Sequence, residues 1–251
     1  MRKFVVWSAV CRDTSKFSYD ISREISVKNK VLLVELPCLG IPRTVRFIKK
    51  IEKGKNIEAE LTYYDRRNEV GFKNCYEIKK NLSIIPANIH STPEFPITHQ
   101  VSQESLISFP EALALKAAEE GFLTVVFECQ GQLTTPMTYK AITTSDLLLV
   151  PIYYPNDIYF SLSNILILEK SFNFKIYKSA IVCSAGLRNL ISEIWMHRNQ
   201  QNQLDLTIWN DNCVKIVNRL IAENHSQNML KTQEARAWSK LSILIRRIFQ
   251  Q

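Results

Sequence analysis

The residues best suited to chemistry lie between the first apolar run of the chain and its first amphipathic segment. This stretch reads Ser8-Ala-Val-Cys-Arg-Asp-Thr-Ser-Lys16, with hydroxyl, carboxylate and basic side chains in close succession. A buried strand, a polar loop and a helix in this order are the usual setting of a phosphate-binding loop. Such a loop normally needs glycine for close backbone approach, but the first glycine is Gly40. The stretch therefore predicts a nucleotide site that has lost its chemistry.

The elements that must position this loop follow from the apolar runs. Continuous β-branched runs recur at residues 4–7, 31–34, 82–85, 123–127, 147–151 and 180–183. Unbroken apolar runs are typical of strands covered on both faces. Helical patterns occupy residues 17–25 and 104–120, and Gly121 ends the second of them. We predict an α/β fold with a mostly parallel central sheet and helices on both faces.

The segment between residues 43 and 80 differs from the rest. Residues 43–53 read as a helix, and residues 61–72 read as a loop or a short hairpin. The segment is strongly basic, so two interpretations stay open. It either contacts an anion or forms a solvated excursion between two core elements.

Composition limits the partners and the compartment. The chain has 251 residues and a net charge of +8, which favours an anionic partner such as nucleic acid or anionic lipid. Its six cysteines are scattered without a CxxC spacing, so we expect reduced thiols in a cytoplasmic protein. The four histidines lack the spacing of metal ligands, and no metal site is predicted. We find no signal peptide and no run long enough to cross a bilayer.

The order of these motifs resembles the ParA/MinD family of deviant Walker ATPases, which includes the TadZ-like pilus-localisation proteins. The resemblance extends over nearly the whole chain. It is carried by five segments in the family's order. The first, residues 4–25, is a strand, a loop and a helix, and the second, residues 31–40, is a strand with an acidic end at Glu35. The others are the segment 81–87, the strand of residues 122–131 with Glu128, and the strand of residues 144–152. The resemblance implies a P-loop NTPase-like fold over residues 1–236.

The resemblance also implies which residues remain from the nucleotide site. They are Asp13, Thr14, Ser15, Lys16, Glu35 and Glu128. The loop lacks the family's glycines and its signature lysine, and Asp13 would place a carboxylate where phosphate binds in the family. Glu35 and Glu128 replace aspartates of the family, and each is one methylene longer, which matters for the octahedral geometry of magnesium. The alternative is that these two glutamates are polar strand ends at the edge of a former cleft.

The last fifteen residues, 237–251, form a predicted basic amphipathic helix. Its apolar face carries Trp238, Leu241, Ile245, Ile248 and Phe249, and its flanks carry Lys240, Arg246 and Arg247. Such a helix suits the surface of an anionic membrane, and it is similar to the membrane-targeting helix that ends MinD proteins. Two alternatives stay open: the helix docks on the core of its own domain, or it binds in a groove of a partner.

These observations predict a non-catalytic positioning or scaffold protein, a pseudo-ATPase without a required cofactor. The resemblance implies that it localises a pilus or secretion apparatus, a division component or a plasmid. The expected partners are a protein of that machine, an anionic membrane surface on the cytoplasmic side and a second copy of the chain. One alternative is a divergent ATPase switch that binds the phosphates of ATP through Ser15 and Lys16, with Glu35 and Glu128 around magnesium. The other is a partition protein that binds DNA non-specifically through its basic segments.

Overall fold

The computed structural model describes residues 1–37, 42–89, 100–129, 133, 135–174, 179–198 and 207–209. All of them belong to one compact unit, Met1–Asp211. The predicted boundary between residues 236 and 237 lies outside the described residues and stays a prediction. No described helix is long and apolar enough to cross a membrane.

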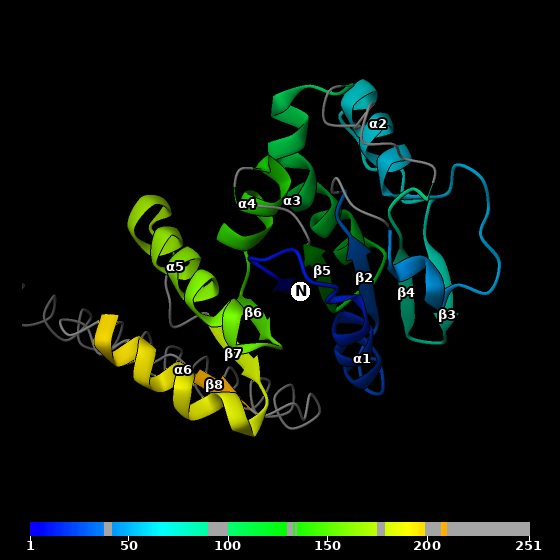
Figure 1. The fold of residues 1–251 in the computed structure, drawn as a ribbon. Coiled ribbons are helices and arrows are strands. Elements are labelled where there is room, and N and C mark those ends of the chain that lie inside the picture. Colours follow the sequence, from blue (N-terminus) through cyan, green and yellow to red (C-terminus); the bar gives the residue numbers. More distant parts are fainter. Residues whose placement is uncertain are drawn as a thin grey trace, which may run out of the picture. The chain divides into compact units, whose positions relative to one another are not determined.

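The central feature is an eight-stranded sheet in the order β3-β4-β2-β5-β1-β6-β7-β8 (Figure 1). Only β3 runs antiparallel, against β4, and the other neighbouring pairs are parallel. The strands are β1 Arg2–Trp7, β2 Val31–Glu35, β3 Tyr76–Lys79, β4 Leu82–Ile85, β5 Thr124–Cys129, β6 Leu147–Ile152, β7 Ser179–Cys183 and β8 Thr207–Trp209. The six apolar runs each form a strand, so the predicted mostly parallel α/β class is confirmed.

Helices connect these strands. They are α1 Ser15–Ile25, the short 3-10 helix η1 Thr44–Phe47, α2 Ile57–Arg67, α3 Gln103–Glu119, α4 Pro136–Thr143, α5 Pro155–Phe172 and α6 Ala185–Arg198. Both helices predicted from periodicity are present. Gly121 follows α3 with φ +81°, and its N–H donates to the carbonyl of Ala118, which is the expected helix stop.

The sheet is covered on both faces because successive strand residues point in opposite directions. On one face, Trp7, Val34 and Phe127 belong to a single core cluster with buried side chains of α2, α3, α4, α5 and α6. The helix α1 packs against β2 and β5, and its buried Ile21 and Ile25 are outside that cluster. The sheet therefore separates α1 from the helices α2 to α6, and the α1 N-terminus lies where β1 ends.

The expectation for the basic segment was wrong in two places. Residues 43–53 form only η1 and an irregular connection, and a helix occupies 57–67 where a loop or hairpin was expected. The Asn56 side chain caps α2 by accepting from the N–H of Ala59 at 2.9 Å. Ile57 and Leu61 are fully buried at helical spacing, and this burial outweighs the weak helix preference of the neighbouring threonine and tyrosines.

Candidate functional site

The loop between β1 and α1 is closed by its own backbone and by one buried serine. The hydroxyl of Ser8 accepts from the backbone N–H of Arg12 at 2.9 Å, and its carbonyl accepts from Cys11 at 3.0 Å. Cys11 has φ +56°, in the left-handed region that glycine adopts without steric cost. The loop thus makes a tight turn without glycine, and two of its N–H groups bond inside the chain.

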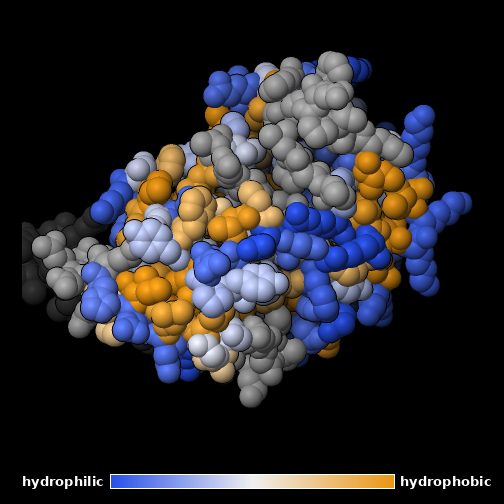
Figure 2. Space-filling model, viewed as in Figure 1, coloured by the Kyte–Doolittle hydropathy of each residue, from blue (hydrophilic) through white to orange (hydrophobic). Residues whose placement is uncertain are grey.

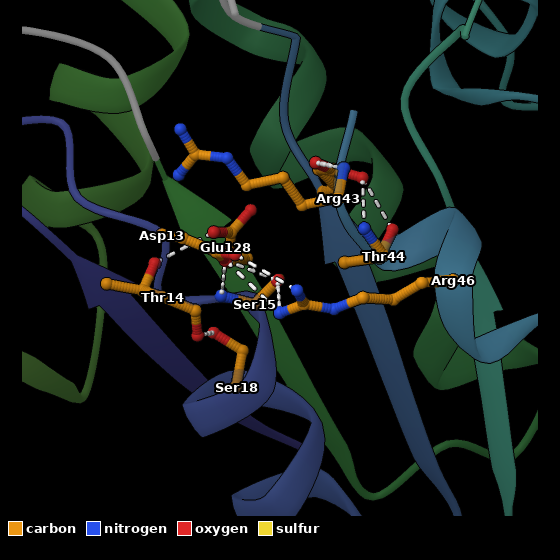
Figure 3. A network of polar contacts seen from close by, with 9 residues as sticks. Asp13, Thr14, Ser15, Ser18, Arg43, Thr44, Arg46 and Glu128 are labelled. Atoms are coloured by element: carbon orange, nitrogen blue, oxygen red, sulfur yellow. Dashed lines mark hydrogen bonds and ion pairs between the residues drawn. The ribbon is translucent and has the colours of Figure 1, made fainter. Parts of the chain in front are cut away.

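An aspartate occupies the N-terminus of α1. Asp13 Oδ1 accepts from the backbone N–H of Ser15 at 3.0 Å and from the Ser15 hydroxyl at 2.6 Å (Figure 3). Arg46, from η1, donates to Asp13 Oδ2 at 3.0 Å and to the Ser15 hydroxyl oxygen at 2.5 Å. The carboxylate thus bonds an N–H at the position where an anion would bind the helix, and a guanidinium neutralises it.

The electrostatic surroundings keep Asp13 ionised. Partial burial acts to raise its pKa, but the two hydrogen bonds from Ser15 and the charges of Arg46 and Arg43 act in the opposite direction. The net result is a pKa below the ordinary value for aspartate. The group therefore carries a negative charge at the helix N-terminus at neutral pH.

A second contact fixes the loop to the sheet. The hydroxyl of Thr14 donates to Glu128 Oε1 at 2.8 Å, and both residues are fully buried. The Thr14 carbonyl accepts from the N–H of Ser18 at 2.9 Å and from the Ser18 hydroxyl at 3.0 Å. The Thr14 hydroxyl is the kind of group that binds magnesium in a phosphate loop, but here it donates to a carboxylate of the sheet.

Glu35, the last residue of β2, lies opposite Glu128 in the register of the two strands. It accepts from the backbone N–H groups of Arg43 at 2.7 Å and Thr44 at 3.0 Å, and from the Thr44 hydroxyl at 2.5 Å. It also accepts from the N–H of Ala87, at 3.3 Å. This buried carboxylate therefore holds the start of η1 and the end of β4 together.

One nitrogen of the Arg43 side chain is buried without a hydrogen-bond partner in the described part of the chain. Among the described residues, its Nη1 is the buried side-chain nitrogen or oxygen atom without a hydrogen-bond partner. Figure 3 shows the side chain extending from the residue just before η1 and passing above Asp13 and Glu128 in this view. A buried, unpaired guanidinium nitrogen costs free energy, so this atom is the best candidate in the cluster for binding an anion.

The structure brings five of the six predicted residues to the carboxyl ends of β1, β2 and β5, the ligand-binding edge of open α/β sheets. They are Asp13, Thr14, Ser15, Glu35 and Glu128. Lys16 is not among them, because its ammonium bonds Asp20 at 2.7 Å on the surface of α1 and its side chain is 76% exposed. No basic residue of α1 itself therefore contributes to the cluster.

Sequence reasoning missed the residues that complete the cluster. Arg43, Thr44 and Arg46 follow β2, and the only signal for them was the basic composition of the segment. Their positions depend on η1, where a longer helix was expected.

A second ion pair fixes the outer side of the loop. Arg12 makes a two-pronged contact with Asp157 of α5, through Nε at 3.1 Å and Nη2 at 3.0 Å. Its guanidinium also lies 5.0 Å from the ring centroid of Tyr154. The hydrogen bond with Asp157 is the main reason that the pKa of Arg12 is raised above its ordinary value. The loop is therefore held by α5 on one side and by η1 on the other.

The described residues contain no candidate metal site, and they do not include the predicted membrane-binding segment. Within those ranges no group of three or more His, Cys, Asp or Glu is placed to hold a metal ion. Among the described residues, cysteines 11, 75, 129 and 183 are not joined in disulfides, while 38 and 213 lie outside those residues. The predicted membrane-binding residues also lie outside them: Trp238, Lys240, Leu241, Ile245, Arg246, Arg247, Ile248 and Phe249.

Comparison by sequence finds nothing: no family model matches the chain, and no curated protein matches it. Comparison by structure finds several solved proteins. A plasmid partition protein from Borrelia burgdorferi has a TM-score of 0.60 at 14% identity, over 90% of this chain and 100% of that one. A ParA family ATPase from Chlorobium tepidum TLS has a TM-score of 0.59 at 14% identity, over 83% and 85%.

The cell-division complex MinC:MinD from Aquifex aeolicus also matches, with a TM-score of 0.55 at 12% identity, over 82% of this chain and 79% of that one. These similarities extend over most of both chains, while the identities are low. The chain therefore has the ParA/MinD type of P-loop NTPase fold, and the resemblance seen in its sequence is confirmed at the level of the fold.

Proposed function

We propose that this chain is a non-catalytic ParA/MinD-like scaffold that positions a larger cellular machine. The observation that carries the proposal is the Asp13 carboxylate, which bonds the Ser15 N–H at the N-terminus of α1. A nucleotide phosphate at this helix end would have to displace the carboxylate from the Ser15 N–H and would meet a like charge that already holds Arg46.

The other side chains that could bind a nucleotide already bond to residues of the chain itself. The Thr14 hydroxyl bonds Glu128, and the Lys16 ammonium bonds Asp20. Arg46, which would be a phosphate ligand in another setting, is held by Asp13 and Ser15. MgATP therefore fits this donor set poorly, and partner binding in such a scaffold would not depend on a nucleotide.

One observation favours a second candidate, a divergent switch that binds ATP. The buried Nη1 of Arg43 lacks a hydrogen-bond partner, and a phosphate oxygen would supply one. This candidate requires Arg43, and not Lys16, to take the role of the phosphate-binding cation. Arg43→Ala should then abolish any ATP binding, whereas Lys16→Ala should leave it unchanged.

The two candidates differ in how the chain associates. A scaffold without a nucleotide holds any dimer by ordinary interface contacts, so ATP should not change its mass in solution. Light scattering on the size-separated full chain, with and without MgATP, measures this directly. An unchanged mass supports the scaffold. A shift from monomer to dimer on addition of MgATP supports the switch.

The proposed cargo is a pilus or secretion apparatus, a division component or a plasmid. Attachment to a membrane through residues 237–251 is part of the proposal and rests on the basic amphipathic pattern of that segment. Without a nucleotide to regulate it, such attachment would be constitutive or set by a partner.

A further inference from the structure

The connection between η1 and α2 carries much of the excess positive charge of the chain. Residues 43–55 hold six lysines or arginines and one glutamate, a net charge of +5 in a chain of +8. Lys49, Lys50 and Lys53 are exposed, and none of them is in an ion pair within the described ranges. Three ammonium groups are therefore available to an acidic partner.

A cavity of about 200 Å³ opens beside these lysines. Residues 51–56 form one wall and residues 86–89, which follow β4, form the other. Two large aliphatic side chains line it while remaining exposed to solvent, Ile51 at 42% and Ile89 at 41%. Figure 2 shows an apolar patch bordered by hydrophilic side chains at the right, over the light-blue segment of Figure 1. Exposed apolar surface with a polar rim is typical of a partner-binding site.

Partly buried hydrogen bonds fix both walls. The N–H of Asn88 donates to the buried carboxyl of Glu58 at 2.8 Å, beside the contact of Ala87 with Glu35. On the opposite wall, the N–H of Glu52 donates to the hydroxyl of Tyr76 at 2.8 Å. The cavity therefore exists before a ligand arrives, which reduces the entropy cost of binding.

The chemistry of this surface selects among possible occupants. A second copy of the chain that met this surface with its own basic segment, as in a two-fold symmetric dimer, would be repelled. The phosphates of duplex DNA would pair with the lysines but would leave both isoleucines in water. An acidic peptide with an aliphatic or aromatic side chain satisfies the lysines and the cavity together.

We propose that the cavity between residues 51–56 and 86–89 binds an acidic peptide segment of a partner protein. An apolar side chain of the peptide enters between Ile51 and Ile89, and its carboxylates pair with Lys49, Lys50 and Lys53. This surface shares no side-chain contact with Asp13, so the inference stands whether or not a nucleotide binds at α1.

The test begins with selection of random peptides displayed on phage against the purified full chain. Enriched sequences should combine several acidic residues with an aliphatic or aromatic one. Fluorescence polarisation of the labelled peptides then gives their Kd. Enrichment of peptides without acidic residues, or of no peptide at all, would overturn the proposal.

Two variants and two matched controls locate the binding site. Lys53→Glu and Ile51→Ser should each weaken peptide binding by about tenfold or more. The same changes at exposed positions before β2, Lys28→Glu and Val27→Ser, should alter the Kd by less than about twofold. Equal losses in the variants and the controls would contradict the proposed site.

The same polarisation assay with labelled duplex DNA distinguishes a DNA-binding surface from a peptide-binding surface. If no acidic peptide binds, and Lys53→Glu weakens DNA binding while Ile51→Ser does not, the surface is a DNA contact and the peptide proposal fails. If DNA binding is absent or unaffected by Lys53→Glu and the selected peptides respond to both variants, the peptide proposal holds.

Discussion

The Oδ1 atom of Asp13 lies 3.0 Å from the backbone nitrogen of Ser15, at the first turn of α1. The chain therefore supplies its own anion at the helix end that faces phosphate in P-loop proteins. Arg46, which lies 33 residues away in sequence, neutralises this anion. The contact works as a structural cap, and its removal should affect stability more than any activity.

Asp13→Ala should destabilise the chain, because the Ser15 N–H then loses its acceptor and Arg46 loses its partner. Asp13 precedes Thr14, the N-cap residue, and loss of a side-chain hydrogen bond of this kind costs about 1 kcal/mol. Asp13→Asn keeps an acceptor oxygen and should cost less. Urea unfolding followed by circular dichroism measures both variants, with Lys16→Ala as a surface control that should change stability by less than about 0.5 kcal/mol. Equal stability of Asp13→Ala and wild type would contradict the capping role.

Thr14→Val should be more damaging, although it preserves the shape of the side chain. It removes the hydroxyl that donates to the buried Glu128 at 2.8 Å and leaves that oxygen short of one partner. A buried polar group that loses its partner costs about 1–3 kcal/mol. Thr14→Ser keeps the hydroxyl and should recover most of the loss in the same unfolding assay. A Thr14→Val variant as stable as wild type would contradict the stabilising role of the hydrogen bond with Glu128.

Glu58 should make stability depend on pH near neutrality. Burial is the main reason that its pKa is raised to about 7, against the hydrogen bond from Asn88 and with a contribution from the charge of Glu35. Between the unfolded pKa and about 7, the folded chain binds more protons than the unfolded chain, so the free energy of unfolding falls as pH rises. Above this window, the loss reaches about 3 kcal/mol.

Glu58→Gln tests this sign directly. The amide oxygen can still accept from Asn88, but the group no longer titrates. Urea unfolding at a series of pH values should show a smaller decline between pH 5 and pH 8, about the range of the shift, in the variant than in wild type. Asp13, whose pKa is lowered, acts in the opposite direction and only at more acidic pH, so it does not obscure this window. Identical slopes in both proteins would contradict the account.

Deletion of residues 237–251 should abolish binding to vesicles that contain anionic lipid. The deleted segment holds the predicted apolar face and its flanking Lys240, Arg246 and Arg247. Sedimentation with vesicles measures binding, and circular dichroism with thermal unfolding measures the fold. Loss of cooperative unfolding in the truncated chain would instead indicate that the segment docks on its own core.

The strands of the fold could be predicted from the sequence because a strand that is buried on both faces is a continuous run of apolar residues. The run Leu147–Ile152, for example, is entirely buried in the sheet, and its pattern is continuous. The helix α2 could not be predicted in this way. It buries two acidic residues, Glu58 and Glu60, and Glu60 accepts from three backbone N–H groups of residues 72–74. Such long-range partners stabilise a helix without leaving a local sequence pattern.

The residues of the candidate site that lie next to each other in the sequence could be predicted, and those brought in by tertiary packing could not. Asp13 and Thr14 lie in the polar stretch between the first apolar run and the first amphipathic segment, which is a local signal. The roles of Arg43 and Arg46 depend on how η1 lies beside α1, and the stacking of Tyr19 on Phe47 at 4.1 Å between ring centroids contributes to that contact. Tertiary packing therefore decides which basic residues of the segment reach the cluster.

The most direct test of the central claim is calorimetry of the purified full chain with ATP and ADP, in the presence of magnesium and up to the millimolar range. We predict no saturable heat, because the Asp13 carboxylate occupies the helix end and Lys16 bonds Asp20. Saturable binding that disappears in Arg43→Ala would contradict the scaffold account and would establish a nucleotide-binding switch.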